Sequence, residues 1–289
     1  MRGKTNEISG HIMAFVCVLV WGSTFVVSKS LMACVQPVQL MLLRFLLAYG
    51  ALWIMYPKWY VCWKEEWKFL VLAVFANTLY CWAENTALTL TQATNVSILV
   101  STSPIVSALL LMLFYREERL NRKQGIGFAV AFTGVILVVF NGAVALKLNP
   151  VGDLLALVAS TSWAVYCILL RLWSDGDDSL LITRKLMFYG ILTVLPMVAM
   201  ETTPIDYDGL LTWGNLLKLA YLGLVGSAGC YFLWNRAVTG IGVLKSNLYI
   251  YMIPLVTLMV SSIFLEESIT AMGFAGILTV IAGMILGTI

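Results

Sequence analysis

Long apolar runs separated by short polar segments recur along the whole chain. Ten of them come close to the roughly 20 mostly apolar residues that a helix needs to cross a bilayer. They lie at residues 10–30, 37–56, 68–90, 93–115, 124–142, 151–172, 181–200, 214–238, 242–265 and 270–288. The pattern predicts an all-α integral membrane protein with ten transmembrane helices.

The composition supports a lipid environment and excludes several classes of function. Hydrophobic residues make up 61% of the 289 residues and charged residues 11%, whereas soluble domains carry about 25% charged residues. The single histidine, His11, argues against a metal site and a histidine-based catalytic triad. The chain has no P-loop, so ATP is not its direct energy source. We expect no cofactor and no nucleic-acid partner, because the basic residues are scattered over short loops.

Lysine and arginine concentrate on one of the two sets of connecting loops. This set contains Arg2, Lys4, Lys58, Lys64, Lys68, Arg116, Arg119, Arg122, Lys123, Arg171, Arg184, Lys185, Arg236 and Lys245. Short cytoplasmic loops carry an excess of basic residues. The bias therefore predicts that both termini are cytoplasmic.

The two halves of the chain share residues at nearly constant spacing. The pairs at a spacing of 150 are Asn85–Asn235, Ala87–Ala237, Thr89–Thr239, Pro104–Pro254, Phe114–Phe264 and Glu117–Glu267. Other pairs include Trp21–Trp163, Gly127–Gly276 and Gly134–Gly283. Two halves of five helices each, residues 1–145 and 146–289, predict an inverted repeat suited to alternating access. The alternative is a chance likeness between apolar helices.

Several motifs carry a resemblance to a known family. They are WGSTFVVSK (21–29), LLRFLLA (42–48), ALTLTQATNVSILVSTSP (87–104), REERL (116–120), GDLLALVASTSWA (152–164), NRAVTGIG (235–242) and EESIT (266–270). In their order and spacing the chain resembles an EamA-type member of the drug/metabolite transporter superfamily. The resemblance implies a ten-helix fold in the cytoplasmic (inner) membrane of a prokaryote. It also implies a central cavity lined chiefly by helices 1, 3, 4, 6, 8 and 9, and transport of amino acids or other metabolites, often outward.

Polar residues follow one face of the expected fourth and ninth helices. Steps of three and four residues place each set of polar residues on a single helix face. The stripe of the fourth helix comprises Thr94, Ser97, Ser101 and Pro104, and that of the ninth helix comprises Asn247, Tyr251 and Pro254. Each proline frees a backbone carbonyl one turn earlier, which a substrate or an ion could use. The stripes predict a cavity between these helices. Alternatively, small residues and prolines let helices pack closely.

Aromatic residues near the middle of their spans are further candidates. Aromatic faces suit amphipathic or cationic organic substrates through stacking and cation–π contacts, although tryptophan and tyrosine also form interfacial belts. The predicted substrate-binding residues are Trp21, Thr24, Tyr80, Glu84, Asn95, Ser97, Ser101, Trp163, Tyr166, Tyr231, Asn235, Asn247 and Tyr251. Structural or gating roles are predicted for Pro104, Pro254 and Arg44.

Glu84 is a carboxylate inside an expected span, where charge is costly and usually functional. Arg44 lies at a similar depth, within about 3 Å at about 1.5 Å per residue. Three roles remain open for Glu84: a structural ion pair with Arg44, binding of a substrate ammonium group, and reversible proton transfer.

These features together favour a secondary transporter of small organic metabolites, and the resemblance indicates an exporter. The expected partners are the substrate and membrane lipid, for a monomer or a homodimer. Transport is either proton-coupled or facilitative. The alternatives are a membrane-embedded enzyme, and a channel or lipid scramblase. Isolated carboxylates and short loops argue against the enzyme.

Overall fold

The protein was analysed as a computed structural model, which describes residues 2–91, 93–114, 121–139, 149–173, 178–265 and 271–288. Every regular element within these residues is a helix. The repeat-related pair Glu117 and Glu267 lies outside the described residues. So does the side chain of Asn95, one of the predicted substrate ligands.

The helices follow the apolar runs of the sequence. Residues 2–139 contain α1 (Arg2–Leu31), α2 (Pro37–Met55), α3 (Glu66–Ala73), the π-helix η1 (Val74–Leu79), α4 (Tyr80–Leu90), α5 (Ala93–Val100), α6 (Ser103–Phe114) and α7 (Arg122–Val139). Residues 150–288 contain α8 (Pro150–Trp173), α9 (Ser179–Ala199), α10 (Tyr207–Leu210), α11 (Trp213–Ala220), the π-helix η2 (Tyr221–Gly229), α12 (Cys230–Ile241), α13 (Val243–Leu248), the 3₁₀-helix η3 (Tyr249–Met252), α14 (Ile253–Leu265) and α15 (Ala271–Thr288).

Seven helical segments in the described part of the chain are long and apolar enough to cross a bilayer. They are Glu7–Leu31, Pro37–Met55, Val96–Leu113, Pro150–Trp173, Ser179–Ala199, Trp213–Ile241 and Val243–Val260. The expected spans at 68–90, 124–142 and 270–288 also fall on helices. Their crossing of the membrane stays a prediction.

π-helical turns interrupt two of the long helical segments. The π-helix η1 joins α3 to α4, and η2 joins α11 to α12. A π-turn displaces the regular α-helical hydrogen bonds and is frequent at functional sites. The hydroxyl of Ser227 donates to the Leu222 carbonyl, five residues earlier, at 2.9 Å. Uniform apolar runs at 68–90 and 214–238 did not predict these turns, because hydropathy does not report hydrogen-bond register.

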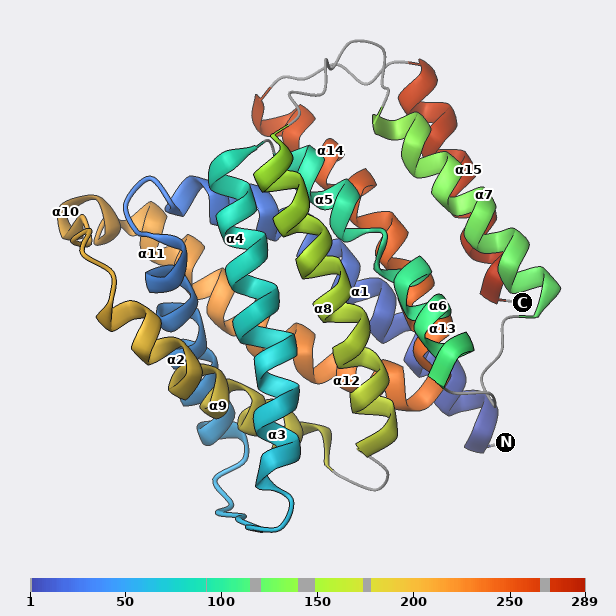
Figure 1. Cartoon of the computed structure of the whole chain (residues 1–289). Coiled ribbons are helices and arrows are strands. Elements are labelled where there is room, and N and C mark those ends of the chain that lie inside the picture. Colours follow the sequence, from blue (N-terminus) through green and yellow to red (C-terminus); the bar gives the residue numbers. More distant parts are fainter. Residues whose placement is uncertain are drawn as a thin grey trace.

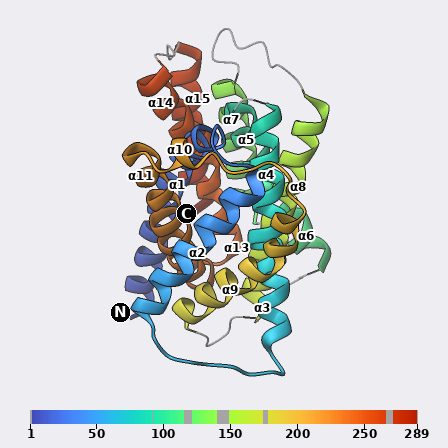
Figure 2. The ribbon, with the colours of Figure 1, turned by 90° about the vertical axis from the view of Figure 1, so that its left-hand side faces the viewer.

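The helices pack in a pattern of matched contacts. α1 packs along α12 and α14, while α8 packs along α4, α5 and α6. Two further pairs are α2 with α9 and α7 with α15. Figure 1 shows α2 and α9 at the left of the bundle and α7 with α15 at the right. In Figure 2, α2 and α9 face the viewer. The centre is therefore left to α1, α4, α8 and α12.

Glycines let α7 and α15 approach each other closely. A Cβ atom at Gly127 would lie 2.7 Å from the Gly283 carbonyl oxygen. One at Gly134 would lie 2.8 Å from the Gly276 carbonyl oxygen. Helices in lipid associate mainly through such van der Waals contact, because burial of apolar surface gains little there. These glycines therefore set the distance between the two helices.

We expect Gly134→Ala to destabilise the α7–α15 contact by about 1–3 kcal/mol, the usual cost of overpacking. The added Cβ would lie 2.5 Å from the Val280 backbone nitrogen. Thermal unfolding in detergent measures the change. Gly125→Ala on the same helix is the control, because nothing lies within 4 Å of its Cβ position. Equal melting temperatures for the two variants would contradict this account.

Candidate functional site

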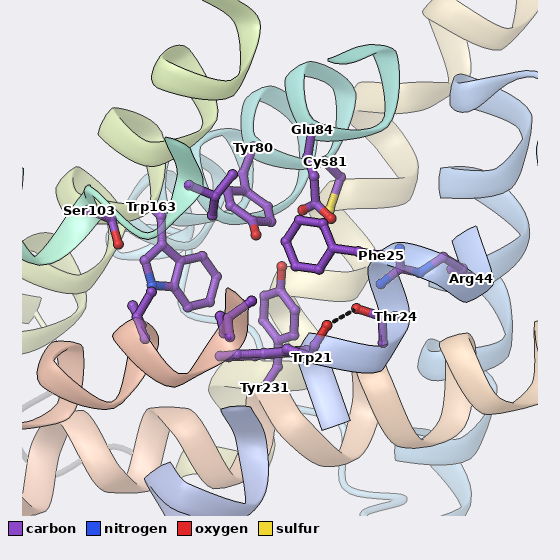
Figure 3. A pocket seen from close by; sticks show the side chains of 13 residues that line it. Trp21, Thr24, Phe25, Arg44, Tyr80, Cys81, Glu84, Ser103, Trp163 and Tyr231 are labelled. Atoms are coloured by element: carbon purple, nitrogen blue, oxygen red, sulfur yellow. Dashed lines mark hydrogen bonds between the residues drawn. The ribbon is translucent and has the colours of Figure 1, made fainter. Parts of the chain in front are cut away.

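A small cavity lies at the centre of the bundle, where α1, α4, α8 and α12 meet (Figure 3). Its volume of about 20 Å³ has room for about one water molecule. The cavity is lined by Trp21, Thr24, Phe25, Arg44, Tyr80, Cys81, Glu84, Val100, Ser103, Trp163, Tyr231, Ile250 and Ile253. In this conformation the cavity therefore has no room for an organic molecule.

Aromatic rings from four helices fill the centre of the site. Trp21 meets Trp163 edge to face, with ring centroids 5.1 Å apart. The ring of Tyr80 lies 5.1 Å from Trp163, and that of Tyr231 lies 5.9 Å from it. Trp234 packs behind Trp21 at 5.1 Å. Each such ring pair adds about 0.5–1.5 kcal/mol beyond the area it buries. The rings stabilise the bundle and fill most of the space at its centre.

Two opposite charges line the same cavity. Arg44 comes from α2 and Glu84 from α4, and each side chain is only 6% exposed. Within the described residues, Arg44 and Glu84 do not form a direct ion pair. The Nε of Arg44 instead donates to the Ser227 hydroxyl at 3.4 Å. Figure 3 shows the two charged side chains on either side of Phe25. Both charges thus remain able to interact with a charged ligand.

The π-helices supply carbonyl groups that anchor the aromatic rings. Trp21 Nε1 donates to the Gly226 carbonyl of η2 at 3.0 Å. The Tyr231 hydroxyl donates to the Ala76 carbonyl of η1 at 2.8 Å. Since every backbone polar group inside a bilayer needs a partner within the protein, these contacts satisfy carbonyls near the displaced turns. They also fix the positions of two rings in the cavity wall.

Two polar atoms in the cavity wall have no hydrogen-bond partner in the part of the chain that the structure describes. These atoms are Nε1 of Trp163 and Oγ of Ser103. Leaving such a buried group unsatisfied costs about 1–3 kcal/mol. Trp163 and Ser103 are therefore the wall residues that would gain most from a polar ligand.

Seven of the residues predicted from the sequence line this cavity. They are Trp21, Thr24, Arg44, Tyr80, Glu84, Trp163 and Tyr231. They come together because α1, α2, α4, α8 and α12 converge on the centre, each contributing residues from one face. Their part in substrate binding stays a prediction.

The described side chains of the polar stripes predicted on helices 4 and 9 do not line this cavity, and the side chain of Thr94 lies outside the described residues. Ser101 Oγ donates to the Ser97 carbonyl at 2.6 Å and also to the Ile250 carbonyl at 3.3 Å. Asn247 Nδ2 donates to the Ser107 hydroxyl at 2.6 Å. The first of these bonds is the common one from a hydroxyl to the carbonyl one turn earlier in the same helix. The bonds to Ile250 and from Asn247 connect the segments of the two predicted helices.

The remaining predicted residues form structural contacts around the site. Asn235 accepts a hydrogen bond from the Tyr166 hydroxyl and donates to Thr183 Oγ1 at 2.9 Å. Tyr251 packs its ring against Phe128, and its buried hydroxyl is unpartnered within the described residues. These groups connect helices that surround the cavity.

The two prolines lie where their helices are interrupted. Pro104 is the second residue of α6, after a break at Ser101 and Thr102. Pro254 is the second residue of α14 and follows the 3₁₀-helix η3. Pro254 was expected to free the backbone carbonyl one turn earlier, which is that of Ile250. This carbonyl accepts a hydrogen bond from the Ser101 hydroxyl.

Six lining residues were not predicted from the sequence. They are Phe25, Cys81, Val100, Ser103, Ile250 and Ile253. Four of them form pairs at the repeat spacing of 150, namely Val100 with Ile250 and Ser103 with Ile253. Cys81 similarly precedes Tyr231 by 150 residues. Applying the repeat to Tyr231 could have found Cys81, whereas the two other pairs join residues of which neither was a candidate.

Comparison with known proteins identifies the family. The sequence profile of the EamA-like transporter family matches residues 8–140 and 150–289. The chain belongs to the EamA-like transporter family. This transporter is a multi-pass membrane protein and not an enzyme. The resemblance to the drug/metabolite transporter superfamily is thereby confirmed.

Several relatives of this EamA-like transporter match over nearly their whole length. An uncharacterized transporter of Archaeoglobus fulgidus is 29% identical over 100% of this chain and 98% of its own. Protein PecM of Dickeya dadantii is 26% identical over 94% and 90%. A probable amino-acid metabolite efflux pump of Salmonella typhimurium is 24% identical over 94% and 92%. A solved crystal structure with 17% identity matches 97% of this chain and 96% of its own at a TM-score of 0.75, which shows a shared fold.

We expect Asn235→Ala to lower the free energy of unfolding by about 1–3 kcal/mol, because it leaves the buried Tyr166 hydroxyl without its acceptor and removes the hydrogen bond that Thr183 accepts. Ser103→Ala should cost little stability, because the Ser103 hydroxyl has no partner to lose in the described structure. Thermal unfolding of the purified protein in one detergent compares the two. A larger loss for Ser103→Ala than for Asn235→Ala would contradict these assignments.

Proposed function

We propose that this protein is a secondary transporter that exports small organic metabolites by alternating access around the central cavity. In this proposal ten transmembrane helices form two inverted repeats, residues 1–145 and 146–289. Both termini face the cytoplasm, in the inner membrane of a prokaryote. The names of the efflux-pump relatives support transport of amino-acid metabolites and the outward direction.

Matched features in the two halves support the inverted repeat. The π-helix η1 shifted by 150 residues covers 224–229, which falls within η2. The contact of Gly127 with the Gly283 carbonyl corresponds to that of Gly134 with the Gly276 carbonyl under the pairing of these glycines. Packing of α1 on α12 likewise corresponds to packing of α8 on α4. Inverted halves that exchange shapes give alternating access.

The substrate class is inferred from the wall of the cavity. Its single most informative feature is a carboxylate and a guanidinium, Glu84 and Arg44, that face one site without pairing. Glu84 suits an ammonium group, and Arg44 suits a carboxylate. Aromatic rings between the charges suit an apolar side chain or a second cation–π contact. We therefore propose a zwitterionic or cationic amine, such as an amino acid or its derivative.

An exchange of tryptophan anchors would couple the two halves. Trp21 corresponds to Trp163 at a spacing of 142, and Gly226 corresponds to Ala76 at a spacing of 150. In the described state Trp21 Nε1 donates to the Gly226 carbonyl, and the Tyr231 hydroxyl donates to the Ala76 carbonyl. Trp163 Nε1 has no partner among the described residues. We propose that in the opposite-facing state Trp163 binds the Ala76 carbonyl and Trp21 releases Gly226.

Glu84→Gln tests the substrate proposal. We expect kcat/KM for amine substrates to fall by about 30-fold or more, because loss of a buried charge partner costs at least about 2 kcal/mol. A panel of amino acids and amines in proteoliposomes, run with and without a pH gradient, provides the measurement. Asp208→Asn, at an exposed carboxylate, is the control and should transport normally.

The pH arm separates the two functional roles of Glu84. If a gradient accelerates the wild type but not the variant, Glu84 also carries the proton. If the pH gradient accelerates transport equally in the wild type and the variant, Glu84 does not carry the proton, and substrate binding is its remaining role. Unchanged transport by Glu84→Gln at every pH would overturn the assignment of Glu84 altogether.

Phenylalanine substitutions test the anchor exchange. Trp21→Phe and Trp163→Phe should each slow transport about five-fold, because each removes a hydrogen bond worth about 1 kcal/mol from one state. They should also shift the conformational equilibrium in opposite directions. Cys81 lines the cavity, and it can be kept as the single cysteine of the protein. Its labelling by an impermeant maleimide added to one side of the membrane or the other then measures the conformational equilibrium.

Trp82→Phe is the matched control, since Trp82 packs on the core without lining the cavity described here. It should leave both the rate and the labelling side unchanged. The exchange is wrong if Trp21→Phe and Trp163→Phe shift labelling toward the same side.

A further inference from the structure

A second, larger pocket lies away from the central cavity, between α2, α9 and the segment that connects α2 to α3. Its volume is about 570 Å³, in the range of pockets that bind drug-sized molecules. Figure 2 shows the connecting segment running along the lower edge of the bundle, beneath α9. The pocket thus lies at one end of these helices rather than at their centre.

The pocket faces outward and its wall is largely aromatic. Phe188 and Leu192, one turn apart on α9, are 37% and 45% exposed. On the connecting segment, Trp59 and Trp63 are 78% and 87% exposed. Tryptophan at the ends of membrane helices typically lies at the level of the lipid headgroups. An acyl chain could therefore enter this pocket from the bilayer without crossing the protein.

Positive charge gathers at the base of this pocket. The guanidinium of Arg184 lies 4.5 Å from the centroid of the Trp53 ring and donates to the backbone carbonyls of Tyr56 and Lys58. These bonds use two of the five N–H donors of an arginine. Arg184 is 4% exposed and has no ion-pair partner among the described residues. A buried cation with unused donors is suited to a phosphate.

The neighbouring ion pair does not neutralise Arg184. Lys185 pairs with Glu66, which also accepts a hydrogen bond from the Tyr189 hydroxyl at 2.7 Å. Burial opposes ionisation of Glu66, yet hydrogen bonds from Lys185, Tyr189 and the Cys62 amide hold its pKa below the ordinary value. Glu66 is therefore ionised at neutral pH and its charge is balanced by Lys185. Two exposed lysines of the connecting segment, Lys58 and Lys64, add to the charge of Arg184.

We propose that this pocket is a binding site for an anionic phospholipid, with the phosphate at Arg184 and an acyl chain along the aromatic wall. The aromatic lining and the exposure of the pocket to the side of the bundle suit an acyl chain. The positive charge of Arg184, together with that of Lys58 and Lys64, favours an anionic headgroup. The site is separate from the central cavity and does not depend on the transported substrate.

Native mass spectrometry of the detergent-purified full chain tests the site. The protein is equilibrated with an equal mixture of phosphatidylglycerol and phosphatidylcholine, and the ratio of the bound lipids is measured. We expect phosphatidylglycerol to predominate. Arg184→Gln should reduce the preference about five-fold, the effect of removing one basic residue near an anionic lipid. Arg236→Gln is the control, because Arg236 is an exposed arginine away from the pocket.

Two additional arms keep the test decisive. If Arg184→Gln does not fold, the exposed double variant Lys58→Gln/Lys64→Gln should still lower the preference. Soluble glycerol 3-phosphate should not displace the lipid, because it lacks the acyl chain; displacement would indicate a free-phosphate site instead. Brominated phosphatidylglycerol should quench tryptophan fluorescence more in the wild type than in Trp59→Phe/Trp63→Phe.

The proposal fails if the wild type binds both lipids equally. It also fails if Arg184→Gln keeps the full preference, or if Arg236→Gln loses as much. Substrate transport is measured separately on the same proteins. A protein that transports normally but shows no lipid preference refutes the lipid site alone, and the reverse result refutes only the transport proposal.

Discussion

The need to satisfy every backbone carbonyl inside the bilayer governs the centre of this transporter. Two π-helices, η1 and η2, displace the regular hydrogen-bond pattern in the middle of long helices. Side chains of other helices bind the carbonyls of these turns, as Trp21 binds Gly226 and Tyr231 binds Ala76. The bonds to these carbonyls therefore also fix two aromatic rings of the cavity wall. A change in either turn would alter both at once.

The two halves use matched residues in different ways, and this asymmetry defines the state described. Trp21 is anchored, whereas the corresponding Trp163 has no partner for its indole nitrogen among the described residues. Arg44 and Arg184, separated by 140 positions, are likewise both buried. Arg44 faces the central cavity, and Arg184 faces the outward pocket. The two arginines that match in the repeat thus line two separate pockets of the bundle.

Much of the centre could be predicted from residue type alone. A charge such as Glu84 or a mid-span ring such as Trp163 is costly or conspicuous in lipid, so it is expected to face the protein interior. Serines were harder to assign, because a hydroxyl can donate to a carbonyl of its own helix or point into a cavity. Ser101 binds carbonyls of two helices, whereas Ser103, two residues on, lines the cavity. Nothing local in the sequence separates them.

The sequence by itself determined the helical class, the positions of the apolar segments and the family, since these depend on hydropathy and motifs read along one chain. Only the tertiary structure decided which polar groups are already paired. Asn247 Nδ2 and the Asn235 amide form hydrogen bonds within the protein, while Trp163 Nε1 and Ser103 Oγ have no partner among the described residues. The π-turns and the small volume of the cavity also became known only from the tertiary structure. Hydrogen-bond register and ring packing depend on contacts between residues more than 100 positions apart, which no local pattern reports.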